Sequence, residues 1–351
     1  MTQPDFSRYL RQTTIPEIGT RGQRRLFDAH AVIVGCGTLG CVTADQLARA
    51  GVGRLTIIDR DLVEPGNLQR QVLFDERHAR ARTPKAAAAS ERVGEINADV
   101  RALPAIADLR PSNAVSLVID GPHGRPDVVL DGTDNFETRY LLNDLCVRHG
   151  MPYLYAGVVG TRAMRAVFAG SYDRPCLRCV FDRPPPPGSQ PTCETAGVLG
   201  PAAATIGGMQ AAEAIKLIVR AETVATDLLQ IDVWTGLRRS TDLSAARDSS
   251  CPCCGDGRFE FLDGPDPEAA GMCGRNAVQV MPAAEHRLVF DELIEQLSSA
   301  GKITSSPFMV RLAPEELPGV SISVFRDGRA VIEGVEDTSR ARALYARYIG
   351  V

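Results

Sequence analysis

The stretch AVIVGCGTLGCVTADQLARA at residues 31–50 decides the fold of this chain. It begins with the apolar run 31–34, continues with glycines in the pattern G-x-G-x-x-G, and ends in the alanine-rich segment 41–50. This order predicts a strand that leads through a tight turn into a helix. The three glycines of the turn are Gly35, Gly37 and Gly40.

A second apolar run at 55–58 ends at Asp59, about 20 residues after the last glycine of the turn. Strand, turn, helix and strand form a βαβ unit, and such units build parallel sheets. Glycines in this pattern let the backbone approach a phosphate closely, and they aim the N–H groups of a helix N-terminus at its charge. The unit is therefore expected to bind a nucleotide, as in a dinucleotide-dependent dehydrogenase. A turn that only tightens helix packing is the less favoured alternative.

Strand and helix patterns alternate as far as residue 155. From residue 158, shorter alternating segments predict a mixed or antiparallel part of the sheet. The chain is therefore expected to be an α/β protein with a Rossmann-like, doubly wound and mainly parallel sheet that has an antiparallel extension. Helices are expected at 86–96, 136–148 and 202–219, strands at 127–130, 163–168 and 228–234, and a loop with four consecutive prolines at 183–191.

A small second domain is expected after a linker. Residues 263–271, DGPDPEAAG, are rich in Gly, Pro and acidic residues, which is typical of a linker. Residues 272–351 are expected to form a small α+β unit, because two apolar runs around an Asp-Gly turn predict a β-hairpin. The hairpin strands are expected at 320–325 and 330–335, and the flanking helices at 289–299 and 338–348.

The composition excludes several classes of protein. With 351 residues, 44% of them hydrophobic, the chain is long enough for about two domains with large cores. The net charge of −4 provides no global positive field, so neither a nucleic acid nor a membrane is expected as a partner. The N-terminal segment lacks the apolar core of a signal peptide, and no apolar stretch reaches the ~18 residues that span a bilayer. A cytoplasmic protein is therefore expected.

Polar residues that suit a polyphosphate follow Asp59. Arg and Lys supply fixed positive charge for phosphates, and Asn and Gln supply hydrogen bonds, which a hydride-transfer site leaves unexplained. These residues are Asn67, Gln69, Arg70, Gln71 and Lys85.

The segment DGTDN at 131–135 ends a predicted strand, where the ligand-facing residues of such sheets lie. A carboxylate there suits Mg²⁺, which takes one or two carboxylates together with substrate phosphates. Asp134 is the first candidate and Asp131 the second. The alternative is that Asp134 caps the helix beginning near Asn135, since Asp is a preferred N-cap residue.

Ten cysteines in a chain expected in a reducing compartment favour metal binding over disulfides. Two C-x-x-C pairs, Cys176 with Cys179 and Cys251 with Cys254, have the spacing of a closed tetrahedral Zn²⁺ site with a structural role. Redox use of one pair is the alternative. Cys253 lies between two candidate ligands and is expected to be a bystander.

Taken together, these motifs resemble the ThiF/MoeB family, the bacterial relatives of the ubiquitin-activating enzymes. The segments that carry the resemblance follow in the family's order: RYLRQ at 8–12, GCGTLG at 35–40, GVGRLTIIDRD at 51–61, NLQRQ at 67–71, PK at 84–85, DGTDN at 131–135 and TCETAGVLGP at 192–201. Both C-x-x-C pairs match as well. CGRNAVQV at 273–280 and the FRDGRAVIEG hairpin resemble the C-terminal extension of the longer ThiF proteins.

The resemblance implies ATP-dependent adenylation of the C-terminal glycine of a small ubiquitin-like sulfur carrier, with release of pyrophosphate. A ThiS-like carrier and thiamine thiazole synthesis are expected. A MoaD-like carrier for molybdopterin is the close alternative, and an NAD-dependent oxidoreductase the distant one. The implied cofactors are ATP, Mg²⁺ and Zn²⁺. The implied partners are the carrier, a sulfur donor such as a cysteine desulfurase, and a second copy of the chain in a homodimer.

The resemblance also implies roles for single residues. Asp134 would hold Mg²⁺ with Asn135 beside it, and Arg11, on an N-terminal arm of residues 1–25, would reach the nucleotide of the other subunit. An ordinary surface arginine is the alternative for Arg11. Residues 26–262 would form the adenylation domain. The other implied nucleotide-binding residues are Gly35, Gly37, Thr38, Gly40, Asp59, Asn67, Gln69, Arg70, Gln71 and Lys85.

Cys193 has two open interpretations. It lies in the segment TCETAG, which resembles a family motif whose cysteine is linked to sulfur transfer. The resemblance implies that Cys193 contacts the activated carrier terminus. A purely structural thiol is the alternative, since free cysteine also behaves as a small hydrophobic residue.

Overall fold

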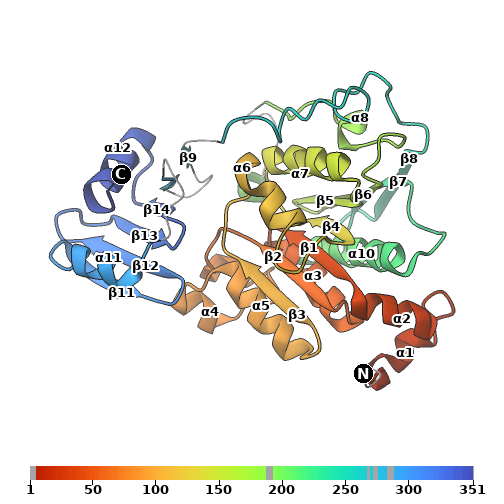
Figure 1. Ribbon diagram of the computed structural model, residues 1–351, viewed down its shortest axis with the longest axis horizontal. Helices are drawn as coiled ribbons and strands as arrows, with labels where there is room; N and C mark the ends of the chain where they lie inside the picture. The colour runs from red at the N-terminus through yellow and green to blue at the C-terminus, as the bar shows by residue number, and fades with distance from the viewer. Residues whose placement is uncertain (1–4, 187–192, 267–268, 272–275, 283–287, 351) are drawn as a thin grey trace. The chain divides into compact units, whose positions relative to one another are not determined.

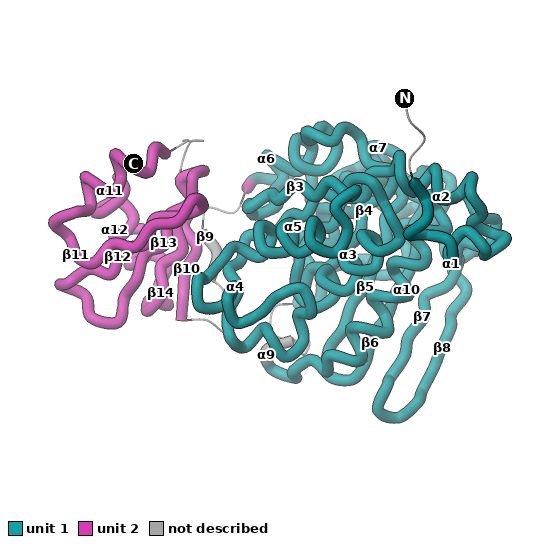
Figure 2. The backbone as a smooth tube through the Cα atoms, turned by 90° about the horizontal axis from the view of Figure 1, so that it is seen from below, with its two compact units in different colours: residues 1–265 teal, residues 266–351 magenta. Residues whose placement is uncertain are grey.

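The computed structural model describes residues 5–186, 193–266, 269–271, 276–282 and 288–350. The chain divides into two compact units, Met1–Pro265 and Asp266–Val351, which Figure 2 shows in different colours. The boundary between the units falls inside the segment expected to be a linker.

The first unit is built on an eight-stranded sheet in the order β3-β2-β1-β4-β5-β6-β7-β8 (Figure 1). Strands β1 to β5 run parallel to one another, and β6, β7 and β8 add to one edge in antiparallel fashion. The expected doubly wound sheet with an antiparallel extension is therefore confirmed. The strands are β1 His30–Val34, β2 Arg54–Ile58, β3 Arg101–Ala105, β4 Val128–Asp131, β5 Tyr153–Val159, β6 Arg162–Phe168, β7 Asp227–Asp232 and β8 Leu237–Asp242.

Helices cover both faces of this sheet. Helices α3, α5 and α10 share one buried core with the strands, and α6, η3 and α7 share a second core on the opposite face (Figure 1). The unit therefore has three layers, as the alternating sequence pattern predicts. Its helices are η1 Ser7–Tyr9, α1 Leu10–Thr13, α2 Gly19–Asp28, α3 Thr38–Ala50, η2 Pro65–Asn67, α4 Glu76–Ala81, α5 Lys85–Ile96, α6 Pro111–Ala114, η3 Val115–Ile119, α7 Phe136–His149, α8 Leu177–Val180, α9 Cys193–Ala196 and α10 Gly200–Val219.

The predicted βαβ unit is present at residues 30–58. Every residue of β1 is buried, as a central strand of a parallel sheet requires, which explains its almost continuous apolar sequence. Helix α3 ends where Gly51 adopts a left-handed backbone with φ of +81°, a conformation that glycine takes without steric cost. Of the predicted proline loop 183–191, residues 184–186 have no regular structure and 187–191 lie outside the described residues.

Helix α10 crosses the first unit. It is long and apolar enough to span a membrane, so the expectation that no apolar stretch reaches that length is wrong. More than half of its apolar window is buried inside the unit, where it packs against α3, β5 and β6. A Cβ on Gly200, its first residue, would lie 3.7 Å from the Cβ of Arg70. At its other end, the Val219 carbonyl accepts a hydrogen bond from Arg25 of α2. One rigid helix therefore connects the polar segment after β2 to the N-terminal helices.

The second unit is a six-stranded antiparallel sheet in the order β11-β12-β13-β14-β10-β9. Helices α11 and α12 share a buried core with the sheet, so the expected small α+β unit is confirmed. The predicted hairpin is the pair β13 and β14, and β9 occupies the end of the predicted linker. The elements are β9 Ala269–Gly271, β10 Ala277–Val280, α11 Phe290–Leu297, β11 Gly301–Ser305, β12 Met309–Pro314, β13 Ser321–Phe325, β14 Ala330–Glu333 and α12 Thr338–Tyr348.

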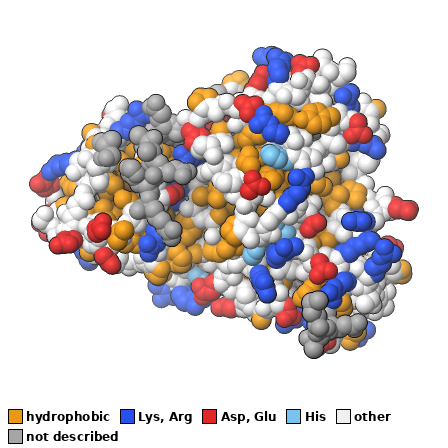
Figure 3. All heavy atoms as spheres, viewed as in Figure 1, with side chains coloured by type: hydrophobic (Ala, Val, Ile, Leu, Met, Phe, Trp, Pro, Cys, Tyr) orange, Lys and Arg blue, Asp and Glu red, His pale blue; other side chains and the backbone are white. Residues whose placement is uncertain are grey.

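Charged side chains of both signs are interspersed on the face shown in Figure 3. Large hydrophobic side chains also remain exposed: Leu10 and Ile15 in the N-terminal segment, and Val72 after the polar segment. Val72 borders a recess of about 390 Å³ whose other walls come from α3 and α10. The N-terminal segment and the region around Val72 therefore present apolar surface to their surroundings.

The sheet order places a topological switch point between the carboxyl ends of β1 and β4, which is called the crevice below. Strand β1 has β2 on one side and β4 on the other, so the connections that follow β1 and β4 lead away in opposite directions. Ligands of doubly wound sheets bind at such a switch point. Here the two loops that meet are the glycine turn after β1 and the segment 131–135 after β4.

We expect the first unit to lose stability in acid because of His30, which begins β1 and is buried. Its ring nitrogens lie 2.9 Å from the Gly124 carbonyl and 2.9 Å from the Thr56 hydroxyl. Burial, with the nearby His123, lowers the pKa of His30 from 6.5 to about 4. The unfolded chain therefore binds more protons between these pH values, and stability falls as the pH decreases through this window.

The expected loss is up to roughly 3 kcal/mol between pH 7 and pH 4. Urea unfolding across this range measures it, and the variant His30→Gln should lose that part of the pH dependence. An unchanged pH dependence in the variant would contradict this assignment.

Candidate active site

The glycine turn and the loop after β4 are packed backbone against backbone. Gly35 has a left-handed φ of +85°, and a Cβ on it would lie 2.7 Å from the carbonyl carbon of Gly132. A Cβ on Gly40 would lie 2.0 Å from the Gly35 carbonyl oxygen, and one on Gly132 would lie 2.2 Å from the same oxygen. Only glycine fits at these three positions, so the two loops of the crevice hold each other in place.

Helix α3 opens toward this turn with its N-terminus. Its first residue is Thr38 and its N-cap is Gly37, which has no side chain to accept a hydrogen bond from the first N–H groups. Uncapped N–H groups and the helix dipole attract an anion. The turn therefore provides a phosphate-binding arrangement.

Asp59 stands at the end of β2 and is 9% exposed. One carboxylate oxygen accepts a hydrogen bond from the Cys36 N–H at 2.6 Å, and the other accepts one from the Asp61 N–H at 2.7 Å. Burial raises the pKa of Asp59, and the charge of Lys85 opposes that shift. Asp59 therefore fixes the glycine turn, and each oxygen retains a lone pair for a ligand hydroxyl.

Lys85 is 4% exposed and is paired with Asp61, a residue that the sequence reasoning did not single out. The Lys85 ammonium lies 2.8 Å from an Asp61 carboxylate oxygen, and the Lys85 N–H donates to the Asp61 carbonyl at 2.8 Å. The signal was present in the sequence, because Asp61 follows Asp59 by two residues at the same strand end. A lysine held by a carboxylate in this way is oriented before any ligand binds.

The predicted polar segment borders the turn. The Gln71 side chain is buried next to Gly37, and its carbonyl oxygen has no hydrogen-bond partner among the described residues. Asn67 is buried and accepts a hydrogen bond from the Glu64 N–H at 2.9 Å. Arg70 is half-buried and donates to the Gly66 carbonyl at 2.6 Å, and Gln69 is exposed. An orphaned polar atom beside the turn is what a site for a polar ligand requires.

The loop 131–135 uses almost all of its polar groups internally. Asp131 is fully buried, accepts hydrogen bonds from the Thr133 N–H and hydroxyl at 2.9 and 2.7 Å, and accepts one from the Tyr153 hydroxyl at 2.8 Å. Asp131 is therefore not available to a metal ion. The cap of α7 is Asn135, whose side-chain oxygen accepts from the Thr138 N–H at 2.7 Å, so the alternative that Asp134 caps this helix is wrong.

Asp134 is exposed and makes no hydrogen bond or ion pair within the described residues. Its position is set by the backbone of the loop, because Thr133 before it and Asn135 after it are both fixed by hydrogen bonds. Its carboxylate is therefore the group of this loop that remains for a ligand.

Arg11 lies away from the crevice of its own chain. It is exposed on α1, and the neighbouring Gln12 donates a hydrogen bond to the carbonyl of Ala50, the last residue of α3. The glycine turn is at the opposite end of α3, about 20 Å away for a helix of this length. The structure therefore brings together the predicted nucleotide residues of the turn and the polar segment with Asp134, and it does not bring Arg11 to them.

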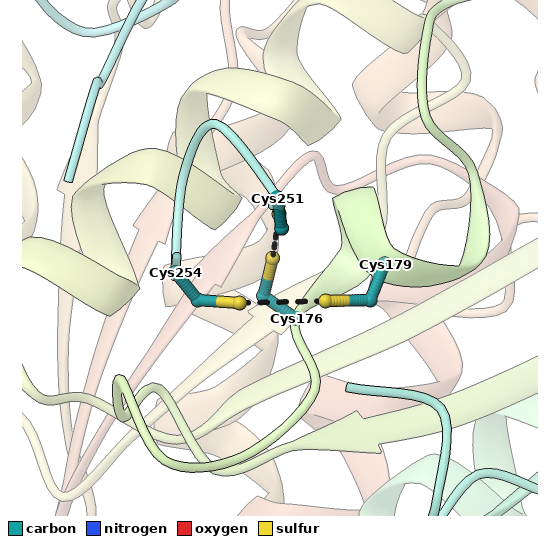
Figure 4. A group of neighbouring side chains, drawn as sticks. All are labelled: Cys176, Cys179, Cys251 and Cys254. Carbon is teal, nitrogen blue, oxygen red and sulfur yellow. Dashed lines mark hydrogen bonds between the residues drawn. The ribbon is translucent and has the colours of Figure 1, made fainter. Parts of the chain in front are cut away.

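Four cysteines gather in one cluster with their sulfurs pointing toward one another (Figure 4). The sulfur of Cys176 lies 3.7 Å from that of Cys251, that of Cys179 lies 3.3 Å from that of Cys254, and all four lie within 4.8 Å of one another. A tetrahedral site with Zn–S bonds of about 2.3 Å places its sulfurs about 3.8 Å apart, so these residues fit a zinc ion.

The short sulfur contacts join the two C-x-x-C motifs to each other, which favours the metal interpretation over a redox pair. Cys253 is buried beside the cluster and is not one of the four; its thiol contacts that of Cys176 and accepts a hydrogen bond from the Asn143 side chain at 3.3 Å. Cys193 is the first residue of α9, and its side chain lies outside the described residues.

Comparison with known proteins identifies several similar chains. A family model described as "ThiF family" matches residues 9–253. The sulfur carrier protein ThiS adenylyltransferase of Bacillus subtilis is 38% identical over 346 residues, which are 98% of this chain and 99% of that protein. The sulfur carrier protein adenylyltransferase of Thermus thermophilus is 38% identical over 73% of this chain and 93% of its own length.

A third relative, the adenylyltransferase and sulfurtransferase MOCS3 of Sus scrofa, is 40% identical over 79% of this chain and 58% of its own length. These three relatives are adenylyltransferases, so the dehydrogenase interpretation of the glycine turn has no support from them. Among solved structures, Escherichia coli MccB with ATP has a TM-score of 0.59 over 71% of this chain and 75% of that one. Its sequence identity of 21% supports a shared fold and nothing finer.

We expect the cysteine cluster to hold one zinc ion per chain and to stabilise the first unit, because it joins segments 71 residues apart in the sequence. Removal of the ion with a chelator should lower Tm by about 10 °C, since structural zinc contributes several kcal/mol. Metal analysis and calorimetry measure both quantities. The variant Cys254→Ser should lose the ion, and the matched variant Cys253→Ser should keep it; equal zinc contents would show that the ligand set is different.

Proposed function

We propose a function for this chain on the premise that it belongs to the ThiF family and is an adenylyltransferase. The proposed reaction is the adenylation, with ATP, of the C-terminal glycine of a ubiquitin-like sulfur carrier protein. The observation that carries the proposal is the unused carboxylate of Asp134, held at the switch point opposite an uncapped helix N-terminus. A metal-bound triphosphate needs both groups.

The proposed chemistry needs no protein nucleophile. The carrier's terminal carboxylate attacks the α-phosphorus of ATP, the bond from that phosphorus to its bridging oxygen breaks, and pyrophosphate leaves with the bond electrons. The product is a mixed anhydride, in which the carboxylate has become a good acyl donor. The work of the protein is to position two anions against each other and to neutralise the charge that develops.

Specific residues are proposed for each task. The N–H groups of Gly37, Thr38 and Gly40 bind phosphate oxygens, and Asp59 accepts a ribose hydroxyl. Asp134 holds Mg²⁺, with Asn135 fixing the loop beside it; the ion supplies charge neutralisation on the phosphates. The side chains proposed to contact the nucleotide around the glycine turn are Asn67, Gln69, Arg70, Gln71 and Lys85.

We propose that Arg11 serves the crevice of a second copy. Its distance from its own glycine turn excludes a role within one chain, and the exposed Leu10 and Ile15 beside it are apolar surface suited to burial. The recess between α3 and α10 opens next to Val72, two residues beyond Arg70. The arm is anchored on its own chain through Gln12 and Gln23, so only its exposed face, with Leu10 and Ile15, is free to pack on the recess of a partner. Such packing would bring Arg11 toward that partner's phosphates, so the proposed active form is a homodimer.

The proposed carrier is ThiS-like, in thiamine thiazole synthesis, because the relative that matches over its full length is named for ThiS. The MoaD-like carrier of molybdopterin synthesis is the second candidate, because the core motifs that carry the resemblance are shared by ThiF-like and MoeB-like proteins. A cytoplasmic location agrees with thiolate ligands for zinc. A cysteine desulfurase is proposed as the sulfur donor.

Cys193 is proposed to contact the activated terminus. In support, the segment that follows it reaches the crevice, because Gly197 accepts a hydrogen bond from the Gly160 N–H after β5 and Gly200 lies against Arg70.

We expect carrier-dependent exchange of labelled pyrophosphate into ATP. ThiS-like and MoaD-like carriers, each intact and lacking the C-terminal glycine, are compared in one assay. Exchange with the intact ThiS-like carrier alone is the expected result, and exchange with the MoaD-like carrier alone assigns the other pathway. The variant Asp134→Asn should lower the rate of pyrophosphate exchange at least ~100-fold, because it removes a proposed metal ligand at the reacting phosphate. No exchange with any carrier from folded, zinc-loaded protein would refute the function.

A mixing experiment tests the role of Arg11. Arg11→Ala and Asp134→Asn should each be nearly inactive alone, but an equimolar mixture of the two should regain about a quarter of the wild-type activity. The reason is that random reassortment makes half of the dimers mixed, and each of these has one crevice with both groups intact. Recovery is measured by the same exchange assay after the subunits have reassociated. No recovery from reassorted dimers would place Arg11 outside the partner's site.

A further inference from the structure

Arg139 is a buried arginine at the wall of the crevice to which the proposed chemistry gives no role. It belongs to the first turn of α7 and is 8% exposed. A guanidinium is costly to bury, so its surroundings should supply both a counter-charge and hydrogen-bond acceptors.

The contacts of Arg139 join two neighbouring strand ends. One terminal nitrogen donates to the Thr133 carbonyl at 2.7 Å, in the loop after β4, and contacts the Ala156 carbonyl of β5 at 3.4 Å. The guanidinium also lies over the Tyr155 ring, 5.1 Å from its centre. Arg139 therefore holds the loop after β4 against β5.

The counter-charge of Arg139 is Asp131. The Nε of Arg139 lies 3.4 Å from an Asp131 carboxylate oxygen, and Asp131 in turn binds the Thr133 N–H and hydroxyl. Thr133 is therefore held at its N–H by Asp131 and at its carbonyl by Arg139. The peptide that carries this carbonyl leads directly to Asp134.

We infer that Arg139 is a positioning residue for the adenylation reaction: by fixing the Thr133 carbonyl, it sets where the Asp134 carboxylate stands in the crevice. The role of Asp134 rests on the proposed function, but the hydrogen bonds by which Arg139 fixes the loop do not. Asp134 makes no hydrogen bond or ion pair among the described residues, although Arg139 and Arg60 are close enough for their charges to act on it. Its position is therefore set by the peptide that precedes it. Small displacements at a reacting centre are costly, because rate depends on alignment.

A buried ion pair with Asp131 could also serve stability alone, so the test must separate position from charge. Arg139→Lys keeps the charge that Asp131 needs. The lysine ammonium does not replace the planar guanidinium, which reaches Thr133, Ala156 and Asp131 together. Arg165→Lys is the matched control, because Arg165 is also buried at 9% exposure and paired with Asp227 at 2.6 Å. It lies on β6 opposite Ala156, but its side-chain hydrogen bonds go to Asp227 and not to the loop after β4.

The first measurement is amide hydrogen exchange of the full chain, which requires no activity. In Arg139→Lys, peptides covering 131–138 should exchange about tenfold faster, while those covering 85–96 stay unchanged, because only the local hold is lost. Arg165→Lys should leave both segments unchanged. Equal exchange of 131–138 in the wild type and in Arg139→Lys would overturn the inference.

The second measurement is the pyrophosphate-exchange assay at varied Mg²⁺ concentration. Arg139→Lys should lower kcat about 10- to 100-fold and raise the half-saturating Mg²⁺ concentration, with the carrier KM within about twofold. In an Asp134→Asn background the same change should add less than about threefold, because both act through one group. If the losses in kcat caused by the two substitutions multiply in the double variant, the inference is overturned. If the wild type catalyses no exchange with any carrier, the proposed function fails, and the hydrogen-exchange result still decides whether Arg139 holds the loop.

Discussion

The contact on which the site depends is that between the backbones of the glycine turn and of the loop after β4. Gly35, Gly40 and Gly132 meet at distances that leave no room for a Cβ, so two loops from different parts of the chain form one rigid wall. The contact arises because β1 and β4 are hydrogen-bonded neighbours and end at the same edge. Asp59 adds a further tie to this wall from β2, through the Cys36 N–H.

The polar groups of the crevice divide into those that build it and those that remain for a ligand. Asp131 and Asn135 accept hydrogen bonds within the loop and from α7, so their desolvation cost is offset within the protein. Arg139 donates to two backbone carbonyls and pairs with Asp131, but its Nε makes no hydrogen bond among the described residues. Asp134 and the carbonyl oxygen of Gln71 have no such partners among the described residues. A rigid frame with a few unsatisfied groups is preorganised, and ligand binding then requires little rearrangement.

Much of this organisation could be predicted from the sequence. The glycine pattern, the acid at the next strand end and the paired cysteines are local signals with fixed spacing, and they predict the βαβ unit, its tight glycine turn and the cluster of four sulfurs. Other features depend on distant contacts. The capping preference of Asp and Asn is similar, so the sequence could not decide between Asp134 and Asn135 as the cap of α7.

The partners of the charged residues were also hidden from sequence reasoning. Asp61 holds Lys85 across 24 positions, and the burial of Arg139 follows from the way α7 lies on the sheet. Neither has a local pattern, because an arginine on a helix is usually exposed. The position of Gly132 against Gly35 likewise becomes visible only once β1 and β4 are known to be neighbours.

Helix α10 has a consequence for how an assembled enzyme would behave. It runs about 30 Å from the segment beside Arg70 to α2, the helix from which the N-terminal arm extends. If each arm completes the crevice of the other copy, as proposed, this helix joins the polar segment of one crevice to the base of the arm that serves the other. Nucleotide binding and the placement of the arm would then be linked, and because linkage is reciprocal, each would affect the free energy of the other equally.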